Sequence, residues 1–179
     1  MGRSVSTADI VRLFGLQGVV LFPRDGRSDP ATETPSTRVL HEVGLPHDDL
    51  FLSRTDVKDP GRDSSLLGGF LALAGRPCPE GAEARLVLGY FPDSLLAFEP
   101  STGNVHAFPE GTGRSLPLHR DVESLVHGLC VLREFHGERA SCEDREPLAL
   151  RARSGTEAFD PLPFADPLSE WNIIADGTR

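Results

Sequence analysis

The stretch LLAFEPSTGNVHAF, Leu95–Phe108, decides the fold class of this sequence. Two short apolar runs, 95–98 and 105–108, flank a polar loop that contains Gly103 and Asn104. Both of these residue types tolerate a positive φ angle, which tight turns require. Two apolar runs around such a loop are typical of a β-hairpin, so we expect two antiparallel strands here.

The neighbouring sequence extends this hairpin into a sheet. Upstream, the apolar run 86–91 is a further strand candidate, closed by the turn residues Pro92 and Asp93. Downstream, the short patch 116–118 is a weaker candidate, because Pro117 suits only an edge strand. The middle of the chain therefore predicts an antiparallel meander.

Helices are expected on either side of the meander. The first covers 8–14 and is capped by Ser6 or Thr7, and the second starts at Thr34 and ends at Gly44. The most regular apolar pattern predicts a third helix over 121–135. Gly128 inside it marks close packing against the sheet. A short strand is expected over 19–22, and a short strand or edge piece over 51–52.

Two parts of the chain have an ambiguous pattern. Residues 66–74 are apolar around a double glycine, and we favour a strand over 70–74. After Gly137 the composition becomes charged and then proline-rich, and 148–150 reads as a strand or a docking segment. We therefore expect an α+β domain over 1–136 and a C-terminal segment, 137–179, that docks on the same domain through its Trp-Ile-Ile cluster.

Size and charge limit the function classes. The chain has 179 residues, which suits one domain, and a net charge of −9. The acidic balance argues against a nucleic-acid partner and permits a basic protein partner. No apolar run is long enough to span a membrane, and we expect no secretory leader. Three widely spaced cysteines fit the reducing cytoplasm better than a disulfide framework.

Few residues suggest catalysis. His119, Glu123 and His127 have the spacing of one helical face and include zinc-ligand types, but a solvated polar face explains them better. Cys78 is a nucleophile only if a histidine lies beside it in space. The pair Tyr90-Phe91 at a strand end is core or, if exposed, an anchor for a protein partner. We expect no cofactor and no catalysis.

Four stretches together resemble a known family. They are RLFGLQGVVLFP (12–23), TPSTRVLHEVGLPHDDLFL (34–52), LVLGYFPDSLLAFEPSTGNVHAF (86–108) and LPLHRDVESLVHGLCVLREF (116–135). Their order and spacing are similar to those of the SUKH superfamily of bacterial immunity proteins, in its fourth subgroup, distantly related to fungal cell-wall assembly regulators. One departure is the stretch His119–Val122, where the family usually has an Asn-Ser-Ser-Leu-like cap.

The resemblance implies a single α+β domain in which helices pack on a twisted, mostly antiparallel sheet. It also implies a cytoplasmic, non-catalytic protein that binds and neutralises a toxin of the nuclease or deaminase type. The net charge fits a basic partner. We expect the contact on loops at strand ends, at Asp48, Asp49, Tyr90, Phe91, Asp93 and Glu99. One alternative is an adaptor in a larger assembly that docks through 147–179, and a minor alternative is a metal-dependent enzyme that uses His119, Glu123 and His127.

Overall fold

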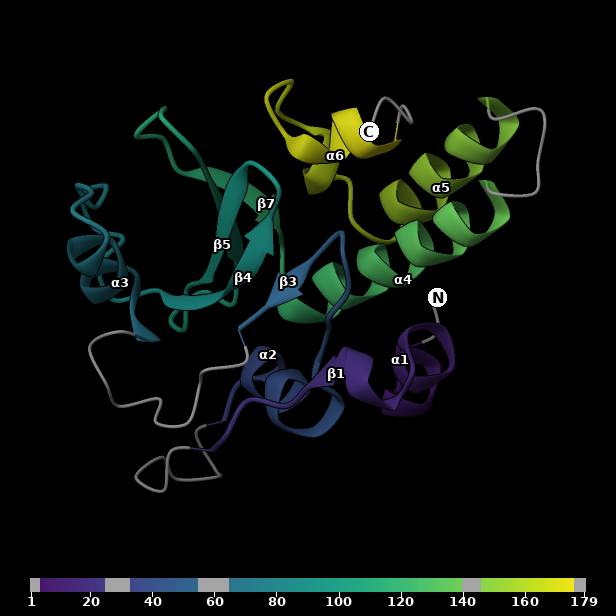
Figure 1. Ribbon diagram of the computed structural model, residues 1–179, viewed down its shortest axis with the longest axis horizontal. Helices are drawn as coiled ribbons and strands as arrows, with labels where there is room; N and C mark the ends of the chain where they lie inside the picture. Colours follow the sequence, from purple (N-terminus) through teal and green to yellow (C-terminus); the bar gives the residue numbers. More distant parts are fainter. Residues whose placement is uncertain (1–3, 25–32, 55–64, 140–145, 176–179) are drawn as a thin grey trace.

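The computed structural model describes residues 4–24, 33–54, 65–139 and 146–175. A five-stranded antiparallel sheet forms its centre and carries helices on both faces (Figure 1). The predicted α+β fold with a mostly antiparallel sheet is therefore confirmed. The strands follow one another in chain order: β3 (Leu52–Ser53), β4 (Leu86–Phe91), β5 (Ser94–Phe98), β6 (Val105–Pro109) and β7 (Leu116–His119).

The hairpin that the sequence predicts is β5–β6. Leu95 pairs with Phe108 and Phe98 with Val105, so the two apolar runs face each other along their length. Gly103 alone supplies the positive φ of the loop, at 88°. Every residue of β5 is buried, because helices cover both faces of the sheet. A second, two-stranded sheet pairs β1 (Val19–Val20) with β2 (Leu45–Pro46).

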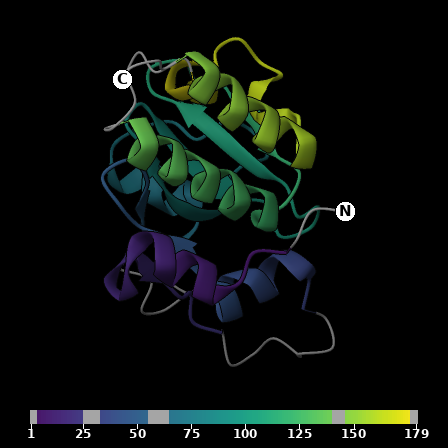
Figure 2. The same cartoon turned by 90° about the vertical axis from the view of Figure 1, so that its right-hand side faces the viewer.

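Three helices form the layer on one face of the sheet. The long helix α4 (Val122–Arg139) lies across the sheet, with α1 (Thr7–Phe14) along one side and α5 (Glu146–Phe159) along the other (Figure 2). Its buried residues include Val122, Leu125 and Leu129, the apolar stripe seen in the sequence. Asp121 caps it, since its Oδ1 accepts the Ser124 N–H at 2.7 Å.

The two N-terminal helices start where the sequence predicts. Ser6 and Asp9 form a reciprocal capping box at α1. Thr34 caps α2 (Pro35–Arg38), which continues as a π-helical turn, η3 (Val39–Val43), and ends at Gly44. A short 3₁₀ turn, η1 (Leu16–Gly18), joins α1 to β1.

The strand predicted over 70–74 is wrong, because this segment is the helix α3 (Leu67–Leu73) on the other face of the sheet. Leu67 and Leu71, four residues apart, are both buried against that face. The N–H groups of Leu67 and Gly68 donate to the carbonyls of Arg85 and Glu83 at 2.8 and 3.0 Å. A side chain at Gly68 would press on Glu83, so the glycine allows this close approach.

Helix α5 is a further departure, since 148–150 lies in its first two turns and is not a strand. After it come the 3₁₀ turn η5 (Leu162–Phe164) and the helix α6 (Glu170–Ala175). Trp171 of α6 is fully buried and meets Phe91, His119 and Phe164 edge-on. Gly128 of α4 therefore packs against this tryptophan and not against the sheet: a Cβ there would lie 2.5 Å from its ring.

A buried polar cluster ties the chain after α5 to the sheet. Asp160 is 1% exposed, and its carboxylate accepts hydrogen bonds from the Arg120 N–H, the Leu162 N–H and the Ser124 hydroxyl. His119 Nδ1 lies 3.4 Å from the same carboxylate. Burial alone would raise the pKa of Asp160, but these donors outweigh it and hold the pKa well below its usual range. Burial lowers the pKa of His119, against the opposing effect of Asp160.

Candidate functional site

A hollow of about 340 Å³ opens at one end of the sheet, and we call it the sheet-end hollow. Three of the residues expected to contact a partner line it: Asp49, Tyr90 and Phe91. A fourth, Asp93, lies in the β4–β5 turn beside it, where its N–H donates to the buried Glu170 of α6 at 2.9 Å. The structure thus brings together residues that are about 40 positions apart in the sequence.

Strand pairing creates this arrangement. Leu52 of the edge strand β3 pairs with Tyr90 of β4, which places the turn before β3 beside the end of β4. Gly89 permits the approach, because a Cβ there would lie 2.5 Å from the carbonyl oxygen of Leu52. Helix α3 closes another side, and its Phe70 ring lies 6.0 Å from that of Tyr90.

The wall of the hollow is mainly apolar. Leu52 is 49% exposed, whereas Phe91 is buried and belongs to the core on the α4 side of the sheet. An exposed leucine beside a half-buried aromatic ring is a common feature of protein-binding surfaces. The remaining apolar lining residues are Leu50, Phe70, Pro92 and Leu95.

Charged groups surround this apolar wall. Asp49 is exposed, and no hydrogen bond or ion pair reaches its carboxylate from the described part of the chain. Glu110 and Arg76 form an exposed ion pair at 3.3 Å. The hollow therefore has two carboxylates and one guanidinium among its lining residues, a net negative charge at an apolar opening.

Asp48 and Glu99 lie elsewhere and have structural partners. Asp48 Oδ1 accepts the N–H groups of Leu50 and Phe51 at 2.9 Å, and its other oxygen is 3.7 Å from Arg133. Glu99 follows the opposite end of β5 from Asp93, so a full strand separates the two carboxylates. Glu99 lies 3.4 Å from the Arg85 guanidinium.

Around Glu99, a hydroxyl, an imidazole and a carboxylate lie in a row. Ser115 Oγ is 3.3 Å from His106 Nδ1, and Glu99 is 3.5 Å from His106 Nε2. This is the residue set of a nucleophilic triad. However, Arg85 donates to the Ser115 oxygen at 2.8 Å, and the same guanidinium lies 3.4 Å from Glu99. The group therefore fits a polar link between the ends of β5, β6 and β7.

The suggested metal ligands have different partners. His119 ends β7 and contacts Asp160, Glu123 accepts the Ser4 hydroxyl, and the His127 ring stacks on Phe159 with ring centroids 4.3 Å apart. The described residues include no group of three or more histidine, cysteine, aspartate or glutamate side chains that could hold a metal ion. Burial, followed by Glu83, raises the pKa of the Cys78 thiol, which opposes a nucleophilic role.

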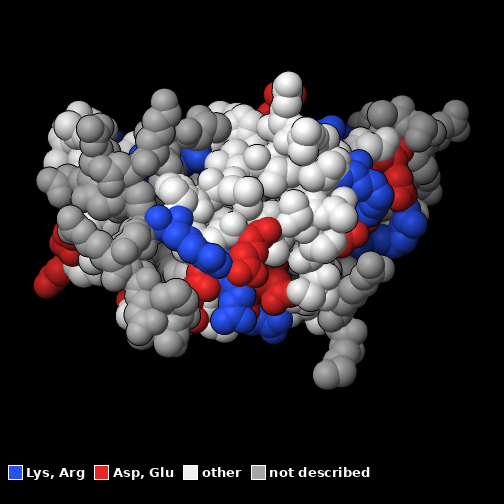
Figure 3. Space-filling model, turned by 90° about the horizontal axis from the view of Figure 1, so that it is seen from below, with Lys and Arg blue, Asp and Glu red and all other residues white. Residues whose placement is uncertain are grey.

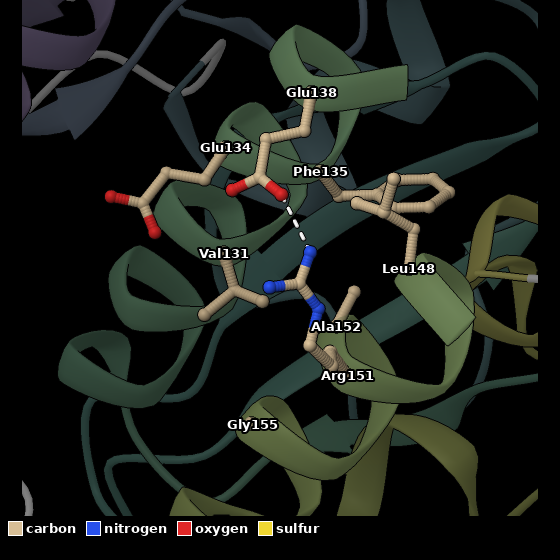
Figure 4. A pocket seen from close by; sticks show the side chains of 8 residues that line it. All are labelled: Val131, Glu134, Phe135, Glu138, Leu148, Arg151, Ala152 and Gly155. Carbon is tan, nitrogen blue, oxygen red and sulfur yellow. Dashed lines mark hydrogen bonds and ion pairs between the residues drawn. The ribbon is translucent and has the colours of Figure 1, made fainter. Parts of the chain in front are cut away.

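A second concavity of 240 Å³ lies between α4 and α5 (Figure 4). Its floor is apolar, and Arg151 of α5 reaches across to Glu138 of α4 at 2.6 Å. Glu134, also at this groove, pairs with Arg12 of α1 at 3.5 Å. Both carboxylates of this groove have cationic partners, whereas Asp49 in the sheet-end hollow has none among the described residues, so the groove offers less to a basic protein.

The face that carries α1 and α2 has mixed charge. Seen from below, basic and acidic side chains alternate in one band, and uncharged atoms fill much of the rest (Figure 3). Glu33 lies 3.5 to 3.8 Å from Arg24, Arg38 and His41, and Arg24 also bonds Glu42 at 2.8 Å. The net acidity of the chain is therefore not expressed as a continuous acidic surface on this face.

Sequence reasoning missed most of the residues that line the hollow. Leu52, Phe70, Arg76 and Glu110 line it but carry no motif, and they come from segments far apart in the chain. Phe70 in particular was assigned to a strand. Leu52 could have been found from the sequence, because an apolar residue in an expected edge piece is a candidate for partner contact.

Comparison with known proteins gives one match. The model of the SUKH-4 immunity protein family matches residues 5–176, which is nearly the whole chain. No curated protein and no solved structure matches this chain. In the part of the chain that the structure describes, no helix is both long and apolar enough to cross a membrane.

Proposed function

Since the chain belongs to the SUKH-4 immunity protein family, we propose that it acts in the cytoplasm by binding and neutralising a cognate toxin of the nuclease or deaminase type. Family membership carries this proposal, because immunity proteins have a protein toxin as their partner. The mechanism that we propose is association and not catalysis, as the family's role implies.

The charge of the chain supports a basic partner. At a net charge of −9, long-range attraction to a cationic domain speeds the encounter and falls with ionic strength. Enzymes that act on nucleic acids need positive surface to hold phosphates, so a nuclease or deaminase domain is a suitable partner. An acidic protein that covers that surface competes with the nucleic acid.

We place the contact at the loops around the sheet-end hollow. Asp49, Tyr90 and Asp93 lie within or beside it and form the centre of the proposed surface, with Phe91 as the buried support beneath. Asp48 contributes indirectly, because it holds the turn that presents Asp49. Glu99 belongs to this surface only if the partner also extends along the sheet to the far end of β5.

Co-expression tests the proposal. A candidate nuclease or deaminase toxin domain is expressed with and without this protein, and cell survival, toxin activity and complex formation are measured at low and high salt. Survival and a stable complex that weakens as salt rises are the expected results. A complex with a non-toxic protein that persists at high salt would contradict the proposal and favour the adaptor alternative. The docking arm of that alternative is largely packed against the body, since Trp171 and Ile174 are buried.

A further inference from the structure

We propose that the sheet-end hollow binds one arginine side chain of the partner, with the aliphatic stem on the apolar wall and the guanidinium at the acidic rim. This inference rests on the proposed function, because it names the kind of residue that the toxin presents. It follows from three observations: the apolar wall of the hollow, the acidic rim, and the contact that Arg54 of this chain already makes with an aromatic ring of the wall.

The wall suits the stem and the flat face of a guanidinium. Leu50 and Leu52 provide aliphatic surface, and the rings of Phe70 and Tyr90 lie 6.0 Å apart with a 54° tilt. Arginine stacks on aromatic faces and buries its methylene groups while its head stays polar. The Phe70 ring already makes such a contact within the chain, since Arg54 Cζ lies 5.8 Å from its centroid.

The rim supplies the counter-charge. Asp49 has no partner within the described part of the chain, so a visiting cation would not have to displace one. Among the described residues, the Glu110 carboxylate pairs with Arg76 alone, and the two side chains are 69% and 40% exposed. Exposed pairs of this kind contribute little to stability, so Glu110 can exchange Arg76 for a better-placed guanidinium at small cost.

Arginine fits this combination better than the other anchor residues. A purely apolar side chain would pack on the wall, but it would remove water from the Asp49 carboxylate without giving it a hydrogen-bond partner, which is unfavourable. Lysine supplies charge but has no planar group to stack on Tyr90 or to bond a carboxylate through two N–H groups. Arginine is also enriched among the residues that dominate binding energy at interfaces.

Three capped amino acids test the inference without the toxin. The N-acetyl, N-methylamide derivatives of arginine, lysine and norleucine are titrated into the isotope-labelled protein, and amide chemical shifts are followed by NMR. The arginine probe should shift the amides of Asp49, Leu52 and Tyr90 saturably, with a dissociation constant on the order of millimolar. The lysine probe should bind several-fold more weakly, and norleucine should give no saturable shifts. Equal shifts from lysine or norleucine, or none from arginine, would overturn the inference.

Variants test it in the complex. Asp49→Asn removes the unpaired carboxylate from an exposed position, and Tyr90→Leu removes the aromatic face; each should weaken toxin affinity about tenfold. Glu146→Gln removes another exposed carboxylate, at the start of α5, and should leave affinity unchanged. If the toxin is neutralised and both hollow variants bind it as the wild type does, the inference fails while the proposed function stands. If the protein neutralises no toxin, the proposed function fails whatever the probes show.

Discussion

Replacing Gly128 by alanine tests how the C-terminal part of the fold is seated on α4. A Cβ at this position would lie 2.5 Å from Cη2 of Trp171 and 3.1 Å from Cζ2. The ring cannot retreat easily, because it is fully buried and meets the rings of Phe91, His119 and Phe164 at 5.1 to 6.0 Å between centroids. The substitution is therefore expected to destabilise the protein although alanine is the better helix former.

The magnitude follows from two opposing effects. Alanine in a helix gains about 1 kcal/mol over glycine. Overpacking a core costs about 1 to 3 kcal/mol, and a contact roughly 1 Å inside the ordinary carbon–carbon separation belongs at the upper end of that range. We expect a net loss of about 2 kcal/mol, which lowers the melting temperature of a chain of this size by about 4 to 8 °C.

Gly137, on the same helix, is the matched control. No atom lies within 4 Å of a Cβ there, so Gly137→Ala should raise the free energy of unfolding by about 0.5 to 1 kcal/mol. Urea unfolding followed by circular dichroism measures both variants. In a Trp171→Phe background, where the ring is smaller, Gly128→Ala should lose most of its cost. If Gly128→Ala is as stable as the wild type or more so, the described contact between α4 and Trp171 is refuted.

Three further predictions concern the buried cluster, the first helix and the thiols. Asp160→Asn should cost about 3 kcal/mol, since it replaces a buried carboxylate that accepts several donors. Folding depresses the pKa of Asp160, so this stability is complete above the unfolded pKa of about 3.9 and is lost progressively as the pH falls through the much lower folded pKa. Urea titrations should therefore show a constant difference between wild type and variant from about pH 5 to 8 and a difference that narrows below about pH 4. A difference that does not narrow between about pH 5 and pH 3 would contradict the assignment. Ser6→Ala should cost about 1 kcal/mol through loss of the capping box, and an unchanged urea midpoint would exclude that role. Burial raises the pKa of Cys130 to about 12, so N-ethylmaleimide should modify it only as fast as the protein opens, and rapid labelling in native buffer, located by mass spectrometry, would show that the helix is more accessible than described.

The parts of the fold that could be predicted are those with local signals. The β5–β6 hairpin depends on a loop whose single positive φ is met by Gly103, and α1 and α2 start at side-chain caps close to them in sequence. Helix α4 repeats its apolar side chains over several turns, which few other structures explain. Such features are set within a few residues of each other.

The errors arose where the deciding contact is distant. The apolar run of α3 is short enough to fit a strand or a helix, and the choice depends on hydrogen bonds to Arg85 and Glu83. Helix α5 buries Leu148, Ala152 and Thr156, a stripe of mostly small side chains that contrasts little with its surroundings. The proline at its second position lies in the first turn, where a helix tolerates proline well.

The candidate site shows the same limit. Asp49 and Tyr90 could be named as residues at strand ends, but their meeting depends on the pairing of Leu52 with Tyr90 across 38 positions of sequence. The separation of Asp93 from Glu99 was visible beforehand, since the strand between them must place its two ends far apart. Sequence does not reveal which carboxylates already accept hydrogen bonds within the chain. Asp48 is an example, because its Oδ1 accepts the N–H groups of Leu50 and Phe51.

The aromatic composition of the chain has a consequence for optical spectroscopy. There is one tryptophan, Trp171, in the centre of the core, and one tyrosine, Tyr90, in the wall of the sheet-end hollow. Emission from the indole will report the packing of α6 against α4, and quenching by the adjacent imidazole will report protonation of His119. Absorption by the phenol will report occupation of the hollow. The protein thus carries separate intrinsic chromophores for folding and for binding, and neither measurement needs a label.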